Sequence, residues 1–151
     1  MKTLVTSILS MLFIFISQAQ AQSPVKEPDY NKPLLFADLP EVMEIHASDL
    51  ETLIAIPMGG NINSVLSEYF PIKGIVVSRS GEEASDVKTV VIRLVNRPGS
   101  TFCISKVKTE TGAYVFIGRV ISMNNSDAFE IAKIDNRYVL QKKHLFDLVN
   151  E

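Results

Sequence analysis

Residues 114–123 read YVFIGRVISM, and this stretch decides the fold class. Successive side chains of a β-strand point to opposite sides of the sheet. The apolar side chains on one side are Tyr114, Phe116 and Val120, and those on the other are Val115, Ile117 and Ile121. A strand that is apolar on both sides is typical of a central strand, either with a packed layer on each side or in a sheet that curls into a barrel.

The run 88–95, KTVVIRLV, has the same two-sided apolar pattern, so we expect these two strands to supply most of the core. Each buried Val, Ile or Phe side chain contributes ~1.5–3 kcal/mol to stability. Ile117→Asp is therefore expected to unfold the domain, because it would bury an unpaired carboxylate. Gly118 lies in the middle of its strand, where a glycine allows a bend or a bulge that helps the sheet to close.

Further runs of β-branched and aromatic residues lie on either side of these two, separated by turn residues at short intervals. The six predicted strands are 72–78, 88–95, 101–107, 114–123, 128–134 and 137–142. Pro98-Gly99 suits a type II turn, Thr111-Gly112 closes the next hairpin, and Asp135-Asn136 tolerates the left-handed backbone of a two-residue hairpin. The pattern predicts a mainly β (α+β) fold, an antiparallel meander of about six to seven strands that forms a sandwich or a barrel-like sheet.

Two segments allow more than one interpretation. In residues 61–70 the apolar side chains fit both strand and helix spacing, and we favour a strand near 61–66. Residues 144–151 end the chain either as a short helix, with Leu145, Leu148 and Val149 at helical spacing, or as a seventh short strand.

One short helix is predicted before the sheet. Ser48 and Glu51 match a capping box, in which each side chain accepts a backbone hydrogen bond at the start of a helix. The apolar residues Leu50, Leu53 and Ile54 then share one face, and Pro57 with Gly59-Gly60 ends the helix after about two turns. A helix of this length needs to pack on another element, and we expect that element to be the sheet.

Residues 22–40 form a proline-rich extended arm, because each of its four prolines removes a backbone donor. The apolar cluster 34–36 is the predicted point at which the arm contacts the body, and residues before about 32 are expected to be mobile. The remaining residues, 41–151, form a single β-rich domain. The arm serves as a spacer or as a segment that engages a partner.

Residues 1–21 have the features of a cleaved signal peptide. Lys2 is followed by an uncharged apolar stretch, 4–16, which is too short to span a bilayer, and Ala19-Gln20-Ala21 matches an A-x-A cleavage site. We therefore predict cleavage between Ala21 and Gln22 and a secreted or periplasmic protein. Without these residues the chain of 151 keeps 130, enough for one domain with a substantial core.

The composition restricts the classes of partner. Loss of Lys2 changes the formal net charge from −2 to −3, which gives no long-range attraction to nucleic acid or to an anionic membrane. No second apolar run is long enough to span a bilayer, so no membrane anchor is expected after cleavage. The single cysteine, Cys103, excludes an internal disulfide and lies far from the cleavage point where a lipid would be attached.

Few residues are candidates for chemistry. Cys103 is a possible nucleophile, but its place in the middle of a strand is typical of a structural cysteine. His46 and His144 are too far apart in sequence to preorganise a metal site, and the acidic loop 80–86 lacks the spacing of a calcium loop. We expect no metal and no cofactor.

Three arginines interrupt apolar strands and are the candidate binding residues: Arg93, Arg119 and Arg137. Each guanidinium either meets an acidic group of a partner or extends to solvent while its stem covers the sheet. We predict an exported, non-enzymatic binding domain for a protein partner of unknown identity and oligomeric state. The alternatives are a small thiol-dependent hydrolase that uses Cys103 with His46 or His144, and a structural subunit of a surface assembly.

Overall fold

The computed structural model describes residues 31–82 and 84–150. The predicted signal peptide, its cleavage site at Ala21 and Gln22, and the first part of the arm lie outside the described residues. They therefore stay predictions.

The described chain contains eight strands and two helices. Their bounds are β1 Val42–Ile45, α2 Ala47–Ala55, β2 Asn61–Ser67, β3 Phe70–Ser80, β4 Val87–Leu94, β5 Ser100–Lys108, β6 Tyr114–Ser122, β7 Asp127–Ile134, β8 Arg137–His144 and α3 Leu145–Asn150. All strands belong to one antiparallel sheet in the order β1-β8-β7-β6-β5-β4-β3-β2. The predicted mainly β fold and antiparallel meander are confirmed, although the strand count is higher than predicted and the described residues form no second sheet that would make a sandwich.

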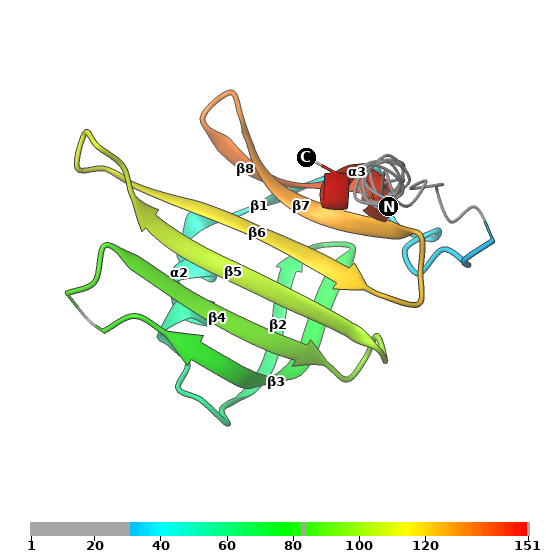
Figure 1. Ribbon diagram of the computed structural model, residues 1–151, viewed down its shortest axis with the longest axis horizontal. Helices are drawn as coiled ribbons and strands as arrows, with labels where there is room; N and C mark the ends of the chain where they lie inside the picture. Colours follow the sequence, from blue (N-terminus) through cyan, green and yellow to red (C-terminus); the bar gives the residue numbers. More distant parts are fainter. Residues whose placement is uncertain (1–30, 83, 151) are drawn as a thin grey trace, which may run out of the picture.

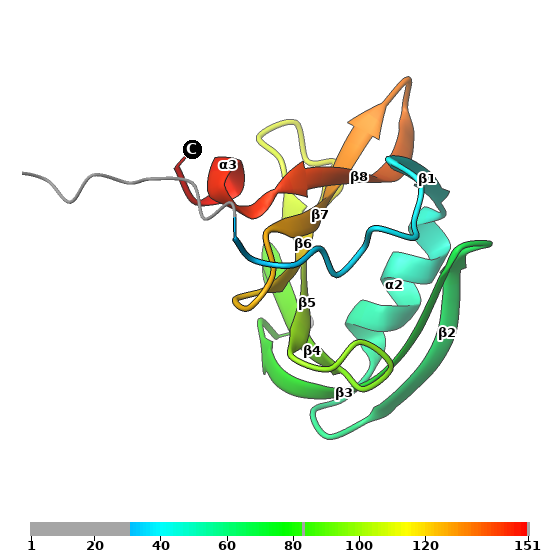
Figure 2. The same ribbon diagram turned by 90° about the vertical axis from the view of Figure 1, so that its right-hand side faces the viewer.

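The sheet curls into a half-barrel, and α2 lies against its concave side (Figures 1 and 2). The main core lies between α2 and this inner side, where Leu50, Leu53 and Ile54 of the helix are buried as predicted. The curl brings neighbouring backbones close: a Cβ at Gly118 would lie 2.4 Å from the carbonyl oxygen of Cys103. Gly118 thus permits the predicted bend, while its strand pairs with β5 in regular register.

The convex side of the sheet differs from the prediction. α3 packs on it at one corner, where Leu145 and Leu148 contact Ala128 and Ile121. Elsewhere on β3 to β6 no described element forms a second layer, and 53% of the Ile117 side chain is exposed. Of the two arrangements predicted for β6, the curled sheet is observed and a packed layer on each side is not. That Ile117→Asp unfolds the domain stays a prediction, and the exposure of Ile117 argues against it. The curl and α2 bury only the inner side.

The turns have the predicted backbone. Gly99 and Gly112 have φ of 81° and 82°, and Asp135 and Asn136 have φ of 49° and 64°. These left-handed residues close the hairpins β4–β5, β5–β6 and β7–β8. The 61–66 strand is confirmed as β2, and the C-terminal segment is the helix rather than the seventh strand.

β1 was not predicted. It contains four residues, too few for a periodic pattern, and its partner β8 lies about a hundred residues later in the sequence. Met43 and Ile45 point inward beside β8, while Val42 and Glu44 point outward. Only the long-range pairing with β8 makes this segment a strand.

The predicted capping box is wrong. The N-cap residue of α2 is His46, whose side chain makes no capping hydrogen bond, and Ser48 lies inside the helix. The Ser48 carbonyl accepts a hydrogen bond from the Thr52 hydroxyl at 2.9 Å, and Glu51 forms an ion pair with Lys106 of β5. The Glu51 carboxylate, which the sequence pattern assigns to capping, therefore links α2 to the sheet instead.

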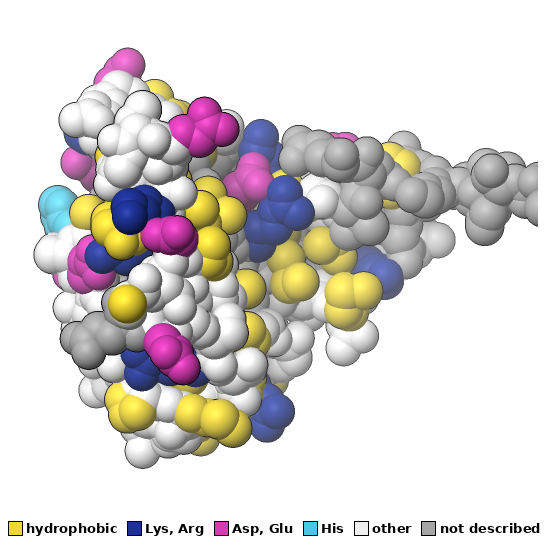
Figure 3. All heavy atoms as spheres, turned by 60° about the vertical axis from the view of Figure 1, so that its left-hand side comes forward, with side chains coloured by type: hydrophobic (Ala, Val, Ile, Leu, Met, Phe, Trp, Pro, Cys, Tyr) yellow, Lys and Arg dark blue, Asp and Glu magenta, His cyan; other side chains and the backbone are white. Residues whose placement is uncertain are grey.

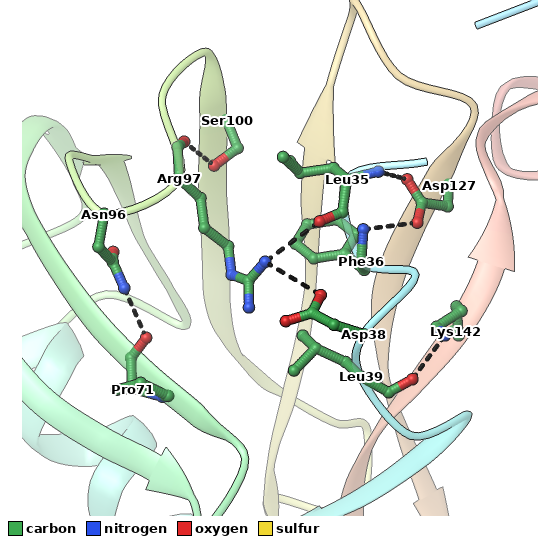
Figure 4. Close-up of polar contacts among 10 residues, drawn as sticks. All are labelled: Leu35, Phe36, Asp38, Leu39, Pro71, Asn96, Arg97, Ser100, Asp127 and Lys142. Atoms are coloured by element: carbon green, nitrogen blue, oxygen red, sulfur yellow. Dashed lines mark hydrogen bonds and ion pairs between the residues drawn. The ribbon is translucent and has the colours of Figure 1, made fainter. Parts of the chain in front are cut away.

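The arm contacts the body through Phe36, whose side chain is fully buried in the core against Phe129. Both carboxylate oxygens of the buried Asp127 accept hydrogen bonds from the arm, at 2.6 Å from the Leu35 N–H and 2.7 Å from the Phe36 N–H (Figure 4). The Arg97 guanidinium lies over the Phe36 ring and donates a hydrogen bond to the Leu35 carbonyl. These contacts make the segment around Phe36 part of the folded body.

Candidate functional site

The candidate site is the outer face, which we define as the convex side of β3 to β6. Its apolar members are Ile75, Val77, Val87, Val91, Cys103, Val107, Val115 and Ile117. The ladder registers align them in rows across the strands, so that Val91, Cys103 and Arg119 are direct neighbours. The outer face is therefore a continuous surface formed by four adjacent strands.

Exposure and polarity distinguish the outer face from the core. Ile75, Val87 and Ile117 are 40%, 48% and 53% exposed, whereas the inner residue Phe116 is only 7% exposed. The Thr89 and Ser105 hydroxyls hydrogen-bond to each other at 2.7 Å, so these two polar groups in the middle of the face satisfy one another. Figure 3 shows hydrophobic side chains on this side of the molecule with Lys and Arg side chains among them.

Of the charged side chains described on the outer face, some form ion pairs and others do not. Arg119 forms an ion pair with Glu130 of β7 at 3.0 Å and donates a hydrogen bond to the Leu148 carbonyl of α3. Arg93 and Lys73 are exposed, and their side chains have no hydrogen-bond or ion-pair partner among the described residues. The unpaired charge on this face of the described chain is consequently positive.

The structure does not bring the three candidate arginines together. Arg93 lies on β4, opposite Ile75 and Thr101, and Arg119 lies two strands away on β6. Arg137 begins β8 and forms an ion pair with Glu44 of the edge strand β1 at 3.1 Å. Arg119 and Arg137 thus join elements of the fold, and of the three only Arg93 has a side chain free for a partner.

Cys103 and the histidines do not form a catalytic group. The strands β6 and β7 separate Cys103 on β5 from β8, which ends at His144, and this corresponds to about 14 Å at the usual strand spacing. His46 follows β1, one strand further away. Burial raises the pKa of the Cys103 thiol, which disfavours the nucleophilic thiolate.

The acidic loop between β3 and β4 does not supply a cation site in the described residues. Asp86 forms an ion pair with Lys108 at 3.3 Å, which neutralises one of its carboxylates. Nowhere in residues 31–82 and 84–150 do three His, Cys, Asp or Glu side chains group closely enough to bind a metal ion.

Sequence reasoning found part of this surface. The alternation in β4 and β6 indicates that the side carrying Val91, Val115 and Ile117 is apolar, and of the two arrangements it allows, a covering layer or a curled sheet, the described chain has the curled sheet. Lys73 was missed because it is a single basic residue in an alternating strand. The sequence does not show which charged side chains form ion pairs. The structure shows this, and therefore also that the unpaired charges on the outer face are positive.

Comparison with protein-family models, curated proteins and solved structures finds no match for this chain. Neither α2 nor α3, the helices of the described part, has the length and apolarity required to cross a bilayer.

Proposed function

We propose that this protein is an exported, non-enzymatic binding domain whose outer face binds the surface of another protein. The observation that carries the proposal is the row of outward β-branched side chains on four adjacent strands, with no covering layer in the described chain. An exposed apolar patch of this kind is typical of an interaction site. Export itself rests on the signal peptide predicted in residues 1–21.

The charges on the outer face favour one kind of partner. Arg93 and Lys73 lie on the same strands as the apolar residues and have no ion-pair partner among the described residues, so a partner with an apolar centre and acidic residues at its rim would complement both properties. A second copy would present the same unpaired cations and would bring its Glu130 already paired with Arg119. The partner is therefore a different protein with an acidic rim.

Site-specific photo-crosslinking tests this proposal. A benzophenone amino acid replaces Ile117 on the outer face or, as a matched control, Met58, which is 71% exposed in the loop after α2. Each variant is expressed and exported in its own cell and irradiated there. We expect position 117, and not position 58, to crosslink to a protein of another sequence.

A charge reversal at Arg93 tests whether the rim of the partner is acidic. Arg93→Glu in the same crosslinking protein should reduce the yield at position 117, because it would repel an acidic rim. The proposal would be overturned if the adduct at position 117 is a dimer of the protein itself, if both positions crosslink alike, if no adduct forms, or if Arg93→Glu leaves the yield unchanged.

The N-terminus of the mature protein tests export separately. Cleavage after Ala21 should give a native protein that begins at Gln22, because Ala19 and Ala21 provide the small side chains that signal peptidase accepts. Intact-mass spectrometry of the protein from its own cell measures this. A protein that retains Met1 in the cytosol would contradict the prediction.

A further inference from the structure

A hollow with an excess of basic side chains lies at the end of the half-barrel where α2 ends. Its volume is about 350 Å³, and its lining residues are Glu51, Ile54, Ala55, Arg79, Lys88 and Lys106. The first three belong to α2 and the last three to β3, β4 and β5. Figure 3, which brings this end of the sheet forward, shows basic side chains beside acidic ones.

The strand register concentrates positive charge on the inner side of the sheet here. Lys88 and Lys106 are directly opposite each other on β4 and β5, an arrangement of like charges that destabilises a sheet. Arg79 joins them because the register shifts between Val76 and Ser78, which places Arg79 opposite the inward-pointing Val90. Three cations thus surround one hollow.

Only one of the three cations is neutralised. Lys106 forms an ion pair with Glu51, and its Nζ lies 4.6 Å from the centre of the Tyr114 ring. Arg79 and Lys88 have no hydrogen-bond or ion-pair partner among the described residues. The hollow therefore keeps two unpaired positive charges, and the buried Ile54 side chain provides an apolar wall.

We infer that this hollow binds a small ligand through an oxyanion, a carboxylate or a phosphate, held between Arg79 and Lys88. The guanidinium donates two parallel hydrogen bonds to such a group, and the lysine adds a point charge. The volume suits a small molecule. An anion there would also relieve the repulsion between Lys88 and Lys106.

The inference is independent of the outer face. Lys88, Lys106 and Arg79 point to the inner side of the sheet, whereas the proposed protein partner contacts the opposite side. A result that contradicts one proposal therefore does not contradict the other.

A titration of the mature protein with inorganic phosphate, and separately with acetate, tests the inference by amide NMR at constant ionic strength. We expect saturable shifts of amides near Arg79, Lys88 and the end of α2. Arg79→Gln and Lys88→Gln should each weaken binding about tenfold, as expected for the loss of one charge-assisted hydrogen bond, and Lys88→Arg should retain it.

The control is Lys73→Gln, which removes an equal charge from the outer side of β3. This variant should bind the anion as the wild type does. Shifts that stay linear with both anions, or equal weakening by Lys73→Gln and Lys88→Gln, would overturn the inference. Thermal unfolding without anion separates anion binding from a purely structural role of the two cations. If Arg79 and Lys88 only offset the dipole at the end of α2, their neutralisation would lower the melting temperature, and the anions would cause no saturable shifts. That result would also overturn the inference.

Discussion

Asp127 joins two segments that are about ninety residues apart in the sequence. It is 2% exposed and accepts the N–H groups of Leu35 and Phe36 at once. A carboxylate suits this position because both of its oxygens are acceptors, whereas an amide offers one. The side chain stabilises the arm in the way that a capping residue stabilises the end of a helix.

Substitution of Asp127 should loosen the arm. Asp127→Ala leaves both N–H groups without their acceptor, so we expect the free energy of unfolding to fall by about 2–4 kcal/mol, and by roughly half that in Asp127→Asn. Urea denaturation measures both values. Asp86→Asn, at an exposed ion pair, is the control and should change stability by less than about 1 kcal/mol. Equal effects at the two positions would disagree with this account.

The burial of Cys103 predicts how the free energy of unfolding changes with pH. Burial raises the pKa of its thiol above the ordinary value of 9.0 in the folded protein, so the unfolded chain loses this proton at a lower pH than the folded one. This group therefore has no effect on stability well below pH 9.0 and lowers the free energy of unfolding as the pH rises through and above that value.

Urea denaturation at several pH values between neutral and alkaline, for the wild type and for Cys103→Ser, isolates this effect. The two proteins differ only at position 103, so the difference between the two curves reports the thiol. We expect the wild type to lose more stability than the variant on the alkaline side. A variant that loses as much would show that the thiol ionises equally in both states.

At the level of the element, β6 has two apolar sides with different environments. Phe116 packs edge-on against Tyr138 at 5.5 Å between ring centres, and its N–H donates to the Tyr138 hydroxyl. The next residue, Ile117, points to the outer face and is half exposed. Apolar character along this strand therefore serves the core on one side and, in our proposal, a partner on the other.

The matched pair Phe116→Asp and Ile117→Asp separates these two roles. The first buries an unpaired carboxylate and should unfold the domain, while the second should change the free energy of unfolding by about 1 kcal/mol or less. Thermal unfolding followed by circular dichroism measures both. If Ile117→Asp also unfolds the protein, the outer face is covered in solution and is unavailable to a partner.

At the level of the whole molecule, one core joins the arm, α2 and the sheet. The rings of Phe36, Phe70 and Phe129 form a cluster with centroid distances of 5.0 to 6.3 Å, although the arm, β3 and β7 supply one ring each. Arg97 lies over two of these rings. The shared cluster means that the arm and the sheet should unfold together.

Phe36→Ala tests this cooperativity. Removing a fully buried phenylalanine creates a cavity, and we expect a loss of about 3–5 kcal/mol. Near-ultraviolet and far-ultraviolet circular dichroism should report the same lowered urea midpoint. As a control, Leu34→Ala removes a neighbouring side chain that is 53% exposed and should cost far less. Separate transitions for the two probes would mean that the arm unfolds on its own.

Local sequence patterns determined most of the sheet. The alternation in β4 and β6 and the turns at Gly99, Gly112 and Asp135-Asn136 predict the strands and their antiparallel order, because strand periodicity and left-handed turn residues act over a few neighbours. The same alternation predicts that the outer side of β6 is apolar.

Only the tertiary structure decided which apolar side is buried, that β1 is a strand, and which charges are paired. Curling the sheet around α2 leaves Ile117 outside, and pairing with β8 creates β1. The register shift beside Val77 turns Arg79 to the inner side, against the simple alternation of β3. Each of these results depends on contacts between residues far apart in the chain, and the spacing of residues along one strand carries no information about them.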